Sequence, residues 1–338
     1  MLHMISHPLQ PGRARNLILH GPSGTGKTRA TLDEALRIVD PLFLEQHHGQ
    51  RSMLKERFDA LADAGRIRRV TFHPGLDYAD FVERRRSDAG TGERVEAGLF
   101  LQFCQDAASD AGRRHAHVLV IDDIHRGEVA RIFGELLTLI EPARRLGKPE
   151  ALQVTLPGSG RRFGVPANLH LIGTVNTSDC PLAELDRALS RRFVFREMPP
   201  QPDLLDGIAV EDVDLGALLR VMNERIEVLL GRDHRIGHGV LMPLAEPGAA
   251  TLAALGRVFR ERVVPLLLQH FAGDWKRIGW VLGDPSKILR EHRFVQPGGP
   301  RTPEDLFGRA VAEQIGDRRW HLVDAAFDRI GSYRGILG

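Results

Sequence analysis

The sequence predicts an α/β fold: a mostly parallel sheet flanked by helices, followed by a smaller helical domain. Three observations support this class. A glycine-rich loop at residues 21–28 directly follows the apolar run Leu17–Leu19. Short β-prone runs then alternate with helical patterns as far as residue 197, and leucine-rich helical patterns dominate from about residue 201. Such alternation is typical of a parallel sheet with helices on its faces.

Five β-prone runs are expected to form this sheet, at residues 16–20, 68–73, 117–122, 168–175 and 193–197. Apolar side chains at helical spacing over residues 129–140 predict a helix with one buried face. A hairpin is expected at residues 152–166, because a Pro-Gly-Ser-Gly turn signal separates two short β-prone runs.

A second, helical domain is expected beyond the proline-rich linker at residues 198–202. Its main helical patterns cover residues 214–230 and 251–271. Trp275 and Trp280, which come after these patterns, are expected in the core of this domain. We therefore expect an α/β nucleotide-binding domain and a helical lid domain, divided as 1–200, with an N-terminal arm at 1–15, and 201–338.

The loop at residues 21–28 matches the phosphate-binding pattern G-x-x-x-x-G-K-[ST] between a predicted strand and a predicted helix. Its glycines permit a tight turn that points backbone N–H groups at phosphate oxygens, and the helix N-terminus adds partial positive charge. The lysine would reach the β- and γ-phosphates, and the threonine hydroxyl would bind Mg²⁺. The expected nucleotide-binding residues are Gly21, Pro22, Ser23, Gly24, Thr25, Gly26, Lys27 and Thr28.

Two aspartates end the apolar strand predicted at residues 117–122. Asp122 would hold Mg²⁺ together with Thr28, and Asp123 stands where a carboxylate usually positions the attacking water. Aspartate is one methylene shorter than the usual glutamate, so its carboxylate would fall about 1 Å short, a misplacement that can cost about a hundredfold in rate. The alternative is a pair of solvated aspartates at a strand end.

Further polar residues follow the next predicted strand. The amide of Asn176 could hydrogen-bond the γ-phosphate or the attacking water, and Asp179 could orient water or an arginine. The same segment is also good turn and helix-cap chemistry. Arg191 and Arg192 would reach the site of a neighbouring subunit and stabilise charge on the transferring phosphoryl group. The alternative for this arginine pair is a solvated surface.

Composition excludes several classes of protein. The net charge of the 338-residue chain is +2, so it has no global basic field that would demand nucleic acid. No apolar stretch approaches the length of a membrane span, and the N-terminus has no signal-peptide pattern. The two cysteines form no framework, and Cys104 is expected to be packed among apolar side chains. We expect a cytoplasmic protein without membrane contact.

Several segments together resemble the McrB-type AAA+ family, the GTP-hydrolysing motor subunits of modification-dependent restriction systems. The residues at 122–136 resemble the family's Asp-Glu-Ile-Asn-Arg-Gly segment, and those at 168–179 resemble its Met-Asn-Thr-x-Asp signature. The residues at 185–193 resemble its arginine-finger segment. Further similar segments are 70–73, 235–238 and 275–284, and all of them occur in the family's order.

The resemblance implies a P-loop AAA+ core with a helical lid, hydrolysing GTP, or alternatively ATP, with Mg²⁺. It also implies self-association into a ring of six subunits and a separate McrC-like nuclease and activator subunit. The family's usual N-terminal DNA-reading domain is not expected within residues 1–15, so DNA contact would belong to other domains or partners.

The chain departs from the family pattern at three positions. Asp123 replaces glutamate, His125 replaces asparagine, and Cys180 replaces arginine. The first puts intrinsic turnover in question and would allow a weakly hydrolysing protein. Two alternative functions stay open. One is an ATP-driven remodelling chaperone, and the other is a nucleotide-gated assembly scaffold with weak hydrolysis. His238 is left open between a nucleotide or subunit contact and an ordinary loop residue.

Overall fold

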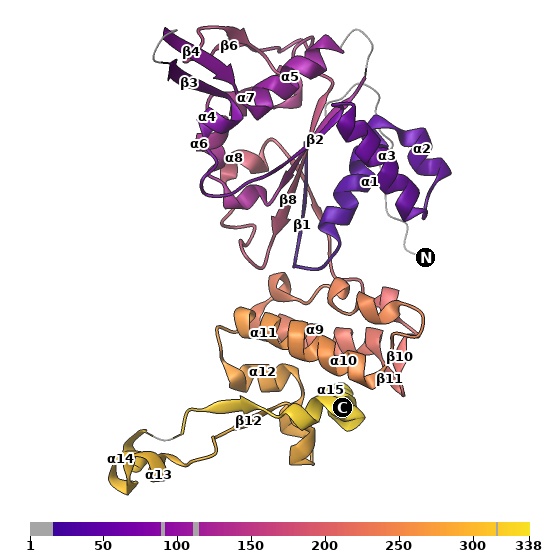
Figure 1. Cartoon of the computed structure of the whole chain (residues 1–338), viewed down its shortest axis with the longest axis vertical. Coiled ribbons are helices and arrows are strands. Elements are labelled where there is room, and N and C mark those ends of the chain that lie inside the picture. The colour runs from indigo at the N-terminus through magenta and orange to yellow at the C-terminus, as the bar shows by residue number, and fades with distance from the viewer. Residues whose placement is uncertain (1–15, 89–91, 111–114, 316) are drawn as a thin grey trace. The chain divides into compact units, whose positions relative to one another are not determined.

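The computed structural model describes residues 16–88, 92–110, 115–315 and 317–338 (Figure 1). The N-terminal arm expected at residues 1–15 lies outside these ranges. The chain forms two compact units. One comprises the residues up to Gly21 with Lys27–Met198, and the other comprises Pro199–Gly338 with the loop residues Pro22–Gly26. We call them the α/β unit and the lid unit, and describe each by itself.

The α/β unit contains a five-stranded parallel sheet in the order β2-β5-β8-β1-β9. This arrangement confirms the predicted α/β class. In register, Gly21 lies opposite Asn176 and Thr71 lies opposite Asp122, so the carboxyl ends of four strands meet at one edge. The strands are β1 (Asn16–Gly21), β2 (Ile67–Thr71), β5 (His117–Asp122), β8 (Leu169–Asn176) and β9 (Val194–Glu197).

Helices cover both faces of the sheet (Figure 1). Because successive strand residues point to opposite faces, Val118 and Val120 pack with one layer of helices, and Leu119 and Ile121 pack with the other. The first layer is α1 (Lys27–Val39), α2 (Pro41–Gln46) and α3 (Arg51–Asp63). The second is α4 (Tyr78–Phe81), α5 (Leu99–Ser109), α6 (Val129–Phe133) and α7 (Leu136–Leu139), with α8 (Arg187–Ser190) following β8.

The single helix predicted over residues 129–140 is wrong, because the structure has two short helices there. Gly134 separates α6 from α7 with a φ of +51°, and a Cβ at this position would lie 2.9 Å from the Tyr78 ring. The predicted apolar face is nevertheless buried, as Ile132 and Leu136 show. Cys104 is buried in α5, as predicted.

Two hairpins extend the α/β unit. Within residues 152–166 the structure has β6 (Val154–Thr155) paired antiparallel with β7 (Arg162–Phe163). A longer hairpin, β3 (Glu83–Asp88) with β4 (Gly92–Ala97), was not predicted.

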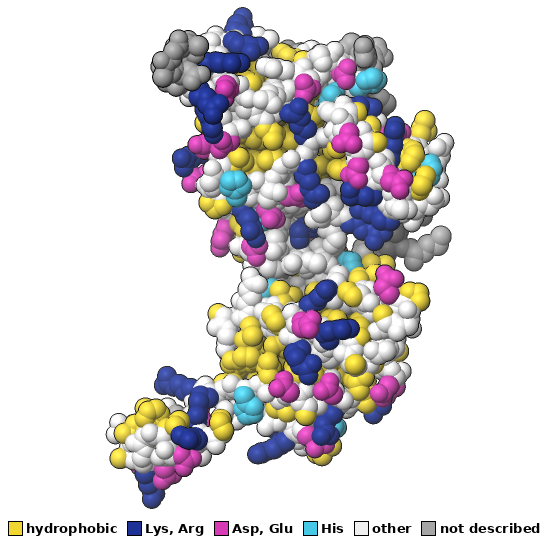
Figure 2. Space-filling view, in the orientation of Figure 1, with side chains coloured by type: hydrophobic (Ala, Val, Ile, Leu, Met, Phe, Trp, Pro, Cys, Tyr) yellow, Lys and Arg dark blue, Asp and Glu magenta, His cyan; other side chains and the backbone are white. Residues whose placement is uncertain are grey.

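On the face shown in Figure 2, cationic side chains alternate with acidic ones over the described surface. This face therefore presents no extended field of a single charge.

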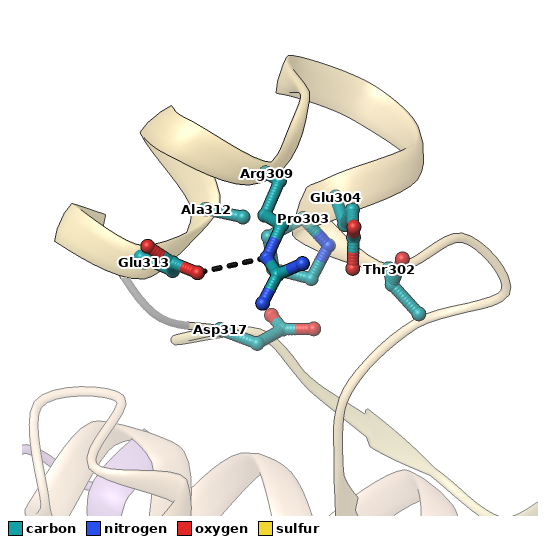
Figure 3. A pocket seen from close by; sticks show the side chains of 7 residues that line it. All are labelled: Thr302, Pro303, Glu304, Arg309, Ala312, Glu313 and Asp317. Carbon is teal, nitrogen blue, oxygen red and sulfur yellow. Dashed lines mark hydrogen bonds and ion pairs between the residues drawn. The ribbon is translucent and has the colours of Figure 1, made fainter.

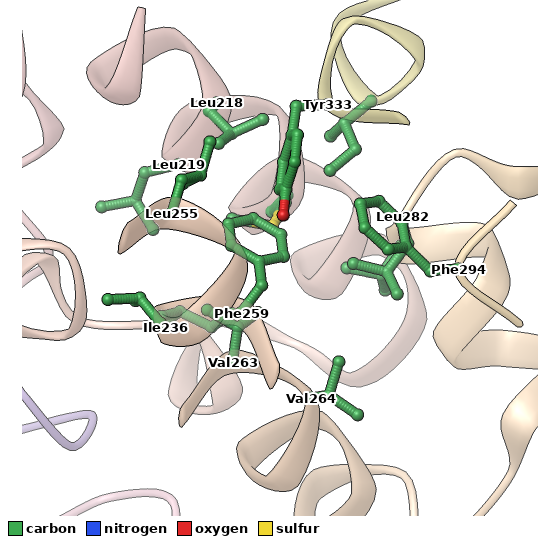
Figure 4. Packing of buried hydrophobic residues seen from close by; sticks show 14 of the residues in the cluster. Leu218, Leu219, Ile236, Leu255, Phe259, Val263, Val264, Leu282, Phe294 and Tyr333 are labelled. Carbon is green, nitrogen blue, oxygen red and sulfur yellow. The ribbon is translucent and has the colours of Figure 1, made fainter. Parts of the chain in front are cut away.

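The lid unit is helical around an aromatic core, in which Tyr333 packs edge-on against Phe259 at 5.0 Å between ring centroids (Figure 4). Its helices are α9 (Leu215–Leu230), α10 (Leu252–Val258), α11 (Val264–His270), α12 (Trp275–Val281), α13 (Pro303–Phe307), α14 (Arg309–Ile315) and α15 (Ile330–Leu337). A π-helical turn, Phe259–Val263, joins α10 to α11.

Two short ribbons complete the lid unit: β10 (Ala209–Val210) with β11 (Val213–Asp214), and β12 (Val295–Pro297) with β13 (Trp320–Leu322). Trp275 packs against the core as predicted. Trp280 is 41% exposed, so its predicted place in the core is wrong. Among the described residues, no helix is long and apolar enough to cross a membrane.

Candidate nucleotide site

The phosphate-binding loop runs from the end of β1 to the start of α1. Gly24 and Gly26 have φ angles of +76° and +84°, a left-handed conformation that only glycine adopts without cost. The Lys27 ammonium donates to the carbonyl oxygen of Gly21 at 2.7 Å, so it lies over the loop. Thr25 ties the turn internally, because its hydroxyl donates to the Pro22 carbonyl oxygen at 3.0 Å. Thr28 is exposed in the first turn of α1.

Two predicted carboxylates lie close enough to act on the charge of Lys27. Burial lowers the pKa of Lys27 to about 8, and the charges of Asp123 and Asp179 oppose this shift. The three residues come from the segments that follow β1, β5 and β8, which are adjacent in the sheet. The structure therefore brings the lysine, the candidate water-positioning carboxylate and the signature aspartate together.

Asp122 and Asp123 differ sharply in their surroundings. Asp122 ends β5 and forms an ion pair with Arg69 of β2, the neighbouring strand. Asp123 leaves the strand in a left-handed conformation (φ 51°, ψ 47°), and its backbone N–H donates to the Thr174 hydroxyl at 3.0 Å. Thr174 thus holds the backbone turn at which the chain leaves β5. Sequence reasoning missed both Arg69 and Thr174, because only strand pairing places them here.

Arg126 connects the two catalytic candidates. Its Nε lies 3.5 Å from Asp123 Oδ2, and its Nη2 donates to Asp179 Oδ2 at 3.2 Å. The side chain is 54% exposed, and the residue ends a 3-10 turn at Ile124–Arg126. The spacing of three residues from Asp123 was the available signal, since such a spacing brings side chains to one side of a helical turn. The described structure therefore ties both carboxylates to one guanidinium.

His125 carries an unexpected feature for a residue in this site. Both ring nitrogens are buried, and neither has a hydrogen-bond partner among the described residues. Burial lowers the pKa of His125, against the charges of Asp123 and Asp179, so the imidazole is neutral at pH 7. A neutral imidazole offers one donor and one acceptor, which suits contact with a water molecule.

The segment after β8 forms a turn that joins it to β1. The Thr177 backbone N–H donates to Gly21 O at 3.1 Å, and the N–H groups of Asp179 and Cys180 donate to the Asn176 carbonyl oxygen. The Asn176 side-chain oxygen accepts a long bond from the Ser178 N–H at 3.4 Å. The turn chemistry expected for this segment is therefore present alongside its place beside the phosphate loop.

The two arginines after α8 have different environments. Arg192 is tied into its own unit: its Nε lies 3.1 Å from Glu141 Oε1, and its Nη1 donates to Ala188 O at 2.8 Å. Arg191 is exposed, and among the described residues its side chain forms no hydrogen bond or ion pair, although its backbone N–H donates to Leu189 O. The sequence alone does not distinguish Arg191 from Arg192, because only the folded chain places Glu141 beside Arg192.

Within the lid unit, a glycine-rich segment lies against the phosphate loop's own backbone. The N–H of Gly237 donates to Ser23 O at 3.2 Å, and that of Gly239 donates to Gly24 O at 2.9 Å. A Cβ on Gly237 would lie 2.2 Å from the Gly24 carbonyl carbon, so no other residue fits there. His238 is buried between them, and its Nδ1 accepts from the Gln201 N–H at 3.1 Å. This hydrogen bond joins two segments of the lid unit.

A separate hollow of about 520 Å³ lies beside α13 and α14 (Figure 3). Arg309 pairs with Glu313 one turn further along α14, at 3.0 Å between Nε and Oε1. None of the predicted site residues lines this hollow. It therefore has no part in the nucleotide site described above.

Comparison with known proteins assigns both units to one family. The family model described as the McrB alpha-helical lid domain matches residues 214–279, and that of the AAA domain (dynein-related subfamily) matches residues 49–193. The chain is 30% identical over 288 residues to the Type IV methyl-directed restriction enzyme EcoKMcrB subunit of Escherichia coli (strain K12). That similarity covers 80% of this chain and 58% of the relative's length.

Proposed function

The chain belongs to the McrB-type AAA+ proteins, and from this premise we propose that it is a ring-forming nucleoside triphosphate hydrolase. The observation that carries the proposal is the meeting of Lys27, Asp123 and Asp179 at the carboxyl edge of the sheet, where both carboxylates act on the lysine's charge. In an open α/β sheet, ligands bind outside the carboxyl ends of the strands. The triphosphate would therefore lie over the loop at residues 21–28.

The residues present fit a magnesium ion. Magnesium is usually bound through one or two protein oxygens together with phosphate oxygens and water. Thr28 offers an exposed hydroxyl, and Asp122 offers a carboxylate that is 15% exposed at the strand end. These two residues would hold the ion, which neutralises phosphate charge when bound. To bind the ion, the Asp122 carboxylate would have to release its ion pair with Arg69.

The attacking water would be positioned by Asp123, Asn176 and His125. The charge of the Asp123 carboxylate acts on Lys27, and the neutral imidazole of His125 offers a further hydrogen bond. Asp179 would hold Arg126 in place, as their contact at 3.2 Å suggests. Of the arginine pair, Arg191 is the residue that would enter the neighbouring subunit's site, while Arg192 holds the segment.

We further propose GTP as the preferred nucleotide and a role as motor subunit of a DNA restriction complex. Both rest on the relative's printed role as a methyl-directed restriction subunit and on the family resemblance. A separate McrC-like nuclease and activator subunit would cut DNA, and DNA contact would come from other domains or partners. The ring would contain six subunits. Preferred turnover of ATP, stimulated by a protein client, would instead favour a remodelling chaperone.

A second function, a nucleotide-gated scaffold with weak hydrolysis, is favoured by one observation. Arg126 engages both Asp123 and Asp179, and Asp123 is short for a water-positioning carboxylate. The test is single-turnover hydrolysis of GTP and ATP by the wild type and by Asp123→Glu. Faster hydrolysis by the variant supports a limit in carboxylate reach, whereas an unchanged rate contradicts it. Turnover below detection in both proteins, with nucleotide bound, would favour the scaffold.

Sharing of one site by two subunits is tested by mixing two inactive variants. Lys27→Ala removes the phosphate-binding lysine, and Arg191→Ala removes the arginine offered to a neighbour. In a mixed assembly, some intact loops face intact arginines, so hydrolysis should return. Native mass spectrometry establishes that mixed rings have formed. Mixed rings without any recovery of turnover would contradict the shared site.

A further inference from the structure

Asn16 uses its whole side-chain amide in contacts far along the chain. It is the first residue of β1 and is 3% exposed. Its Nδ2 donates to Ile140 O at 2.8 Å and to Arg192 O at 2.9 Å, and its Oδ1 accepts from Arg145 Nη2 at 3.0 Å. Both hydrogens and the oxygen of the amide are therefore engaged. One side chain thus joins β1 to the segment that carries the arginine pair.

Arg145 holds the other end of the Asn16 amide in place. It is fully buried, and no carboxylate pairs with it within the described ranges. Instead it donates to the carbonyl oxygens of Ile140 at 2.9 Å, Pro166 at 3.3 Å and Leu169 at 3.4 Å, besides Asn16. A buried charge is costly unless it is hydrogen-bonded, so these acceptors must stay in place. The Asn16 amide is held in turn by this array.

Arg192, which Asn16 joins to β1, is held by three contacts. Its carbonyl oxygen accepts from Asn16, its Nε lies 3.1 Å from Glu141, and its Nη1 donates to Ala188 O at 2.8 Å. Glu141 directly follows Ile140, the other carbonyl that Asn16 engages. The residue that follows Arg191 is therefore held, while the side chain of Arg191 stays exposed.

We propose that Asn16 is a positioning residue for Arg191, the arginine offered to the neighbouring subunit. The inference rests on the proposed function, in which Arg191 acts in a shared site. Strand β1 ends at Gly21 in the phosphate loop and begins at Asn16, so one six-residue strand carries the chain's own loop and anchors the arginine it presents. A displacement of about 1 Å at a reacting centre can cost about a hundredfold in rate.

The test variant is Asn16→Asp. A carboxylate at this position still accepts from Arg145 and adds an opposite charge, but it cannot donate to the carbonyl oxygens of Ile140 and Arg192. The matched control is Asn168→Asp. Asn168 Nδ2 also donates to two carbonyl oxygens, of Ala107 and His115, each at 2.8 Å, and neither belongs to the arginine segment.

Each protein is measured as a small minority in two mixtures. In an excess of Lys27→Ala subunits, its intact loop receives an arginine from its neighbour, so turnover reports its own loop. In an excess of Arg191→Ala subunits, only the arginine it donates completes a site, so turnover reports that arginine. A general structural defect lowers both rates, whereas a positioning defect lowers only the second.

For Asn16→Asp we expect near wild-type turnover in the first mixture and a loss of between about tenfold and a hundredfold in the second. Asn168→Asp should give equal ratios in both. Equal losses by Asn16→Asp, or no loss in the second mixture, overturn the inference. If the wild type adds no turnover to that of the excess variant in either mixture, the shared site is contradicted, and the inference is contradicted with it. If Asn16→Asp does not assemble, Asn16→Ser is measured in its place with the same criteria.

Discussion

Among the described residues, the α/β unit buries an arginine and the lid unit buries a lysine, and the two cations are stabilised in different ways. Arg145 in the α/β unit is fully buried, with carbonyl oxygens and the Asn16 amide as its acceptors. Lys287 in the lid unit is 5% exposed and pairs with Asp284 at 2.9 Å, above the Phe294 ring at 4.1 Å. Asp284 also accepts from the N–H groups of Phe294 and Val295.

The difference follows from the shape of the two cations. A guanidinium presents five N–H donors in a fixed plane and can satisfy several carbonyl groups at once, whereas an ammonium is a compact point charge. Burial lowers the pKa of both cations, that of Arg145 to about 10 and that of Lys287 to about 8, and the nearby Asp284 carboxylate opposes the shift of Lys287. The lysine therefore depends on its carboxylate partner, and the arginine does not.

The largest effect is expected from breaking the pair in the lid unit. Asp284→Asn leaves the ammonium of Lys287 buried without its carboxylate, which should cost about 3–5 kcal/mol in the free energy of unfolding. Lys287→Met should cost less, because Asp284 keeps two backbone donors. All three tryptophans, Trp275, Trp280 and Trp320, lie in this unit, so urea unfolding followed by tryptophan fluorescence reports it selectively. A larger loss for Lys287→Met would contradict this account.

The next effect is expected at the arginine array. Arg145→Lys replaces a planar fork by a point charge that cannot reach all four acceptors, and should cost about 2–3 kcal/mol. Hydrogen exchange of peptides from β1 and β8 measures the change in the α/β unit. The matched control is Arg144→Lys, whose side chain is 41% exposed and contacts Glu141. Equal effects at the two positions would show that the buried array lacks the proposed importance.

A smaller effect is expected from pH at Lys27, the partly buried cation of the nucleotide site. Its pKa in the free protein is about 8 because of burial, and bound phosphates would raise it. Above pH 8, binding must then take up a proton, so triphosphate affinity should fall about tenfold per pH unit, or about 1.4 kcal/mol. Titration calorimetry in two buffers measures this uptake. Lys27→Arg, which stays charged, should show no such slope, and a slope in it would point to another group.

The smallest effect is expected for an exposed cation, which sets the baseline of the comparison. Arg309 pairs with Glu313 at 3.0 Å, and the two side chains are 80% and 67% exposed. Arg309→Ala should change the free energy of unfolding by less than about 0.5 kcal/mol, because solvent screens such pairs. Tryptophan fluorescence during urea unfolding again provides the measurement. A loss comparable to that of Asp284→Asn would show that burial is not what separates these cations.

Sequence reasoning succeeded where the signal is local. The phosphate loop, the strand ending at Asp122 and the turn beginning at Asn176 each depend on neighbouring residues, and the structure has the strands and turn where predicted. Sequence reasoning failed where the same local pattern is compatible with two different structures. The apolar spacing over residues 129–140 fits one helix, but Gly134 breaks it, and the apolar Trp280 remains exposed.

By itself, the sequence determined where the five strands of the parallel sheet lie along the chain and the α/β class, and it predicted the residues that would meet a triphosphate. These follow from hydrophobic periodicity and from the backbone freedom of glycine, which act over a few residues. Only the tertiary structure decided that Arg126 joins Asp123 to Asp179, that Arg192 is tied while Arg191 is exposed, and that Asn16 anchors their segment. Asn16 and Arg192 are 176 residues apart. Strand pairing and the need to satisfy buried polar groups bring them together, and neither leaves a local pattern in the chain.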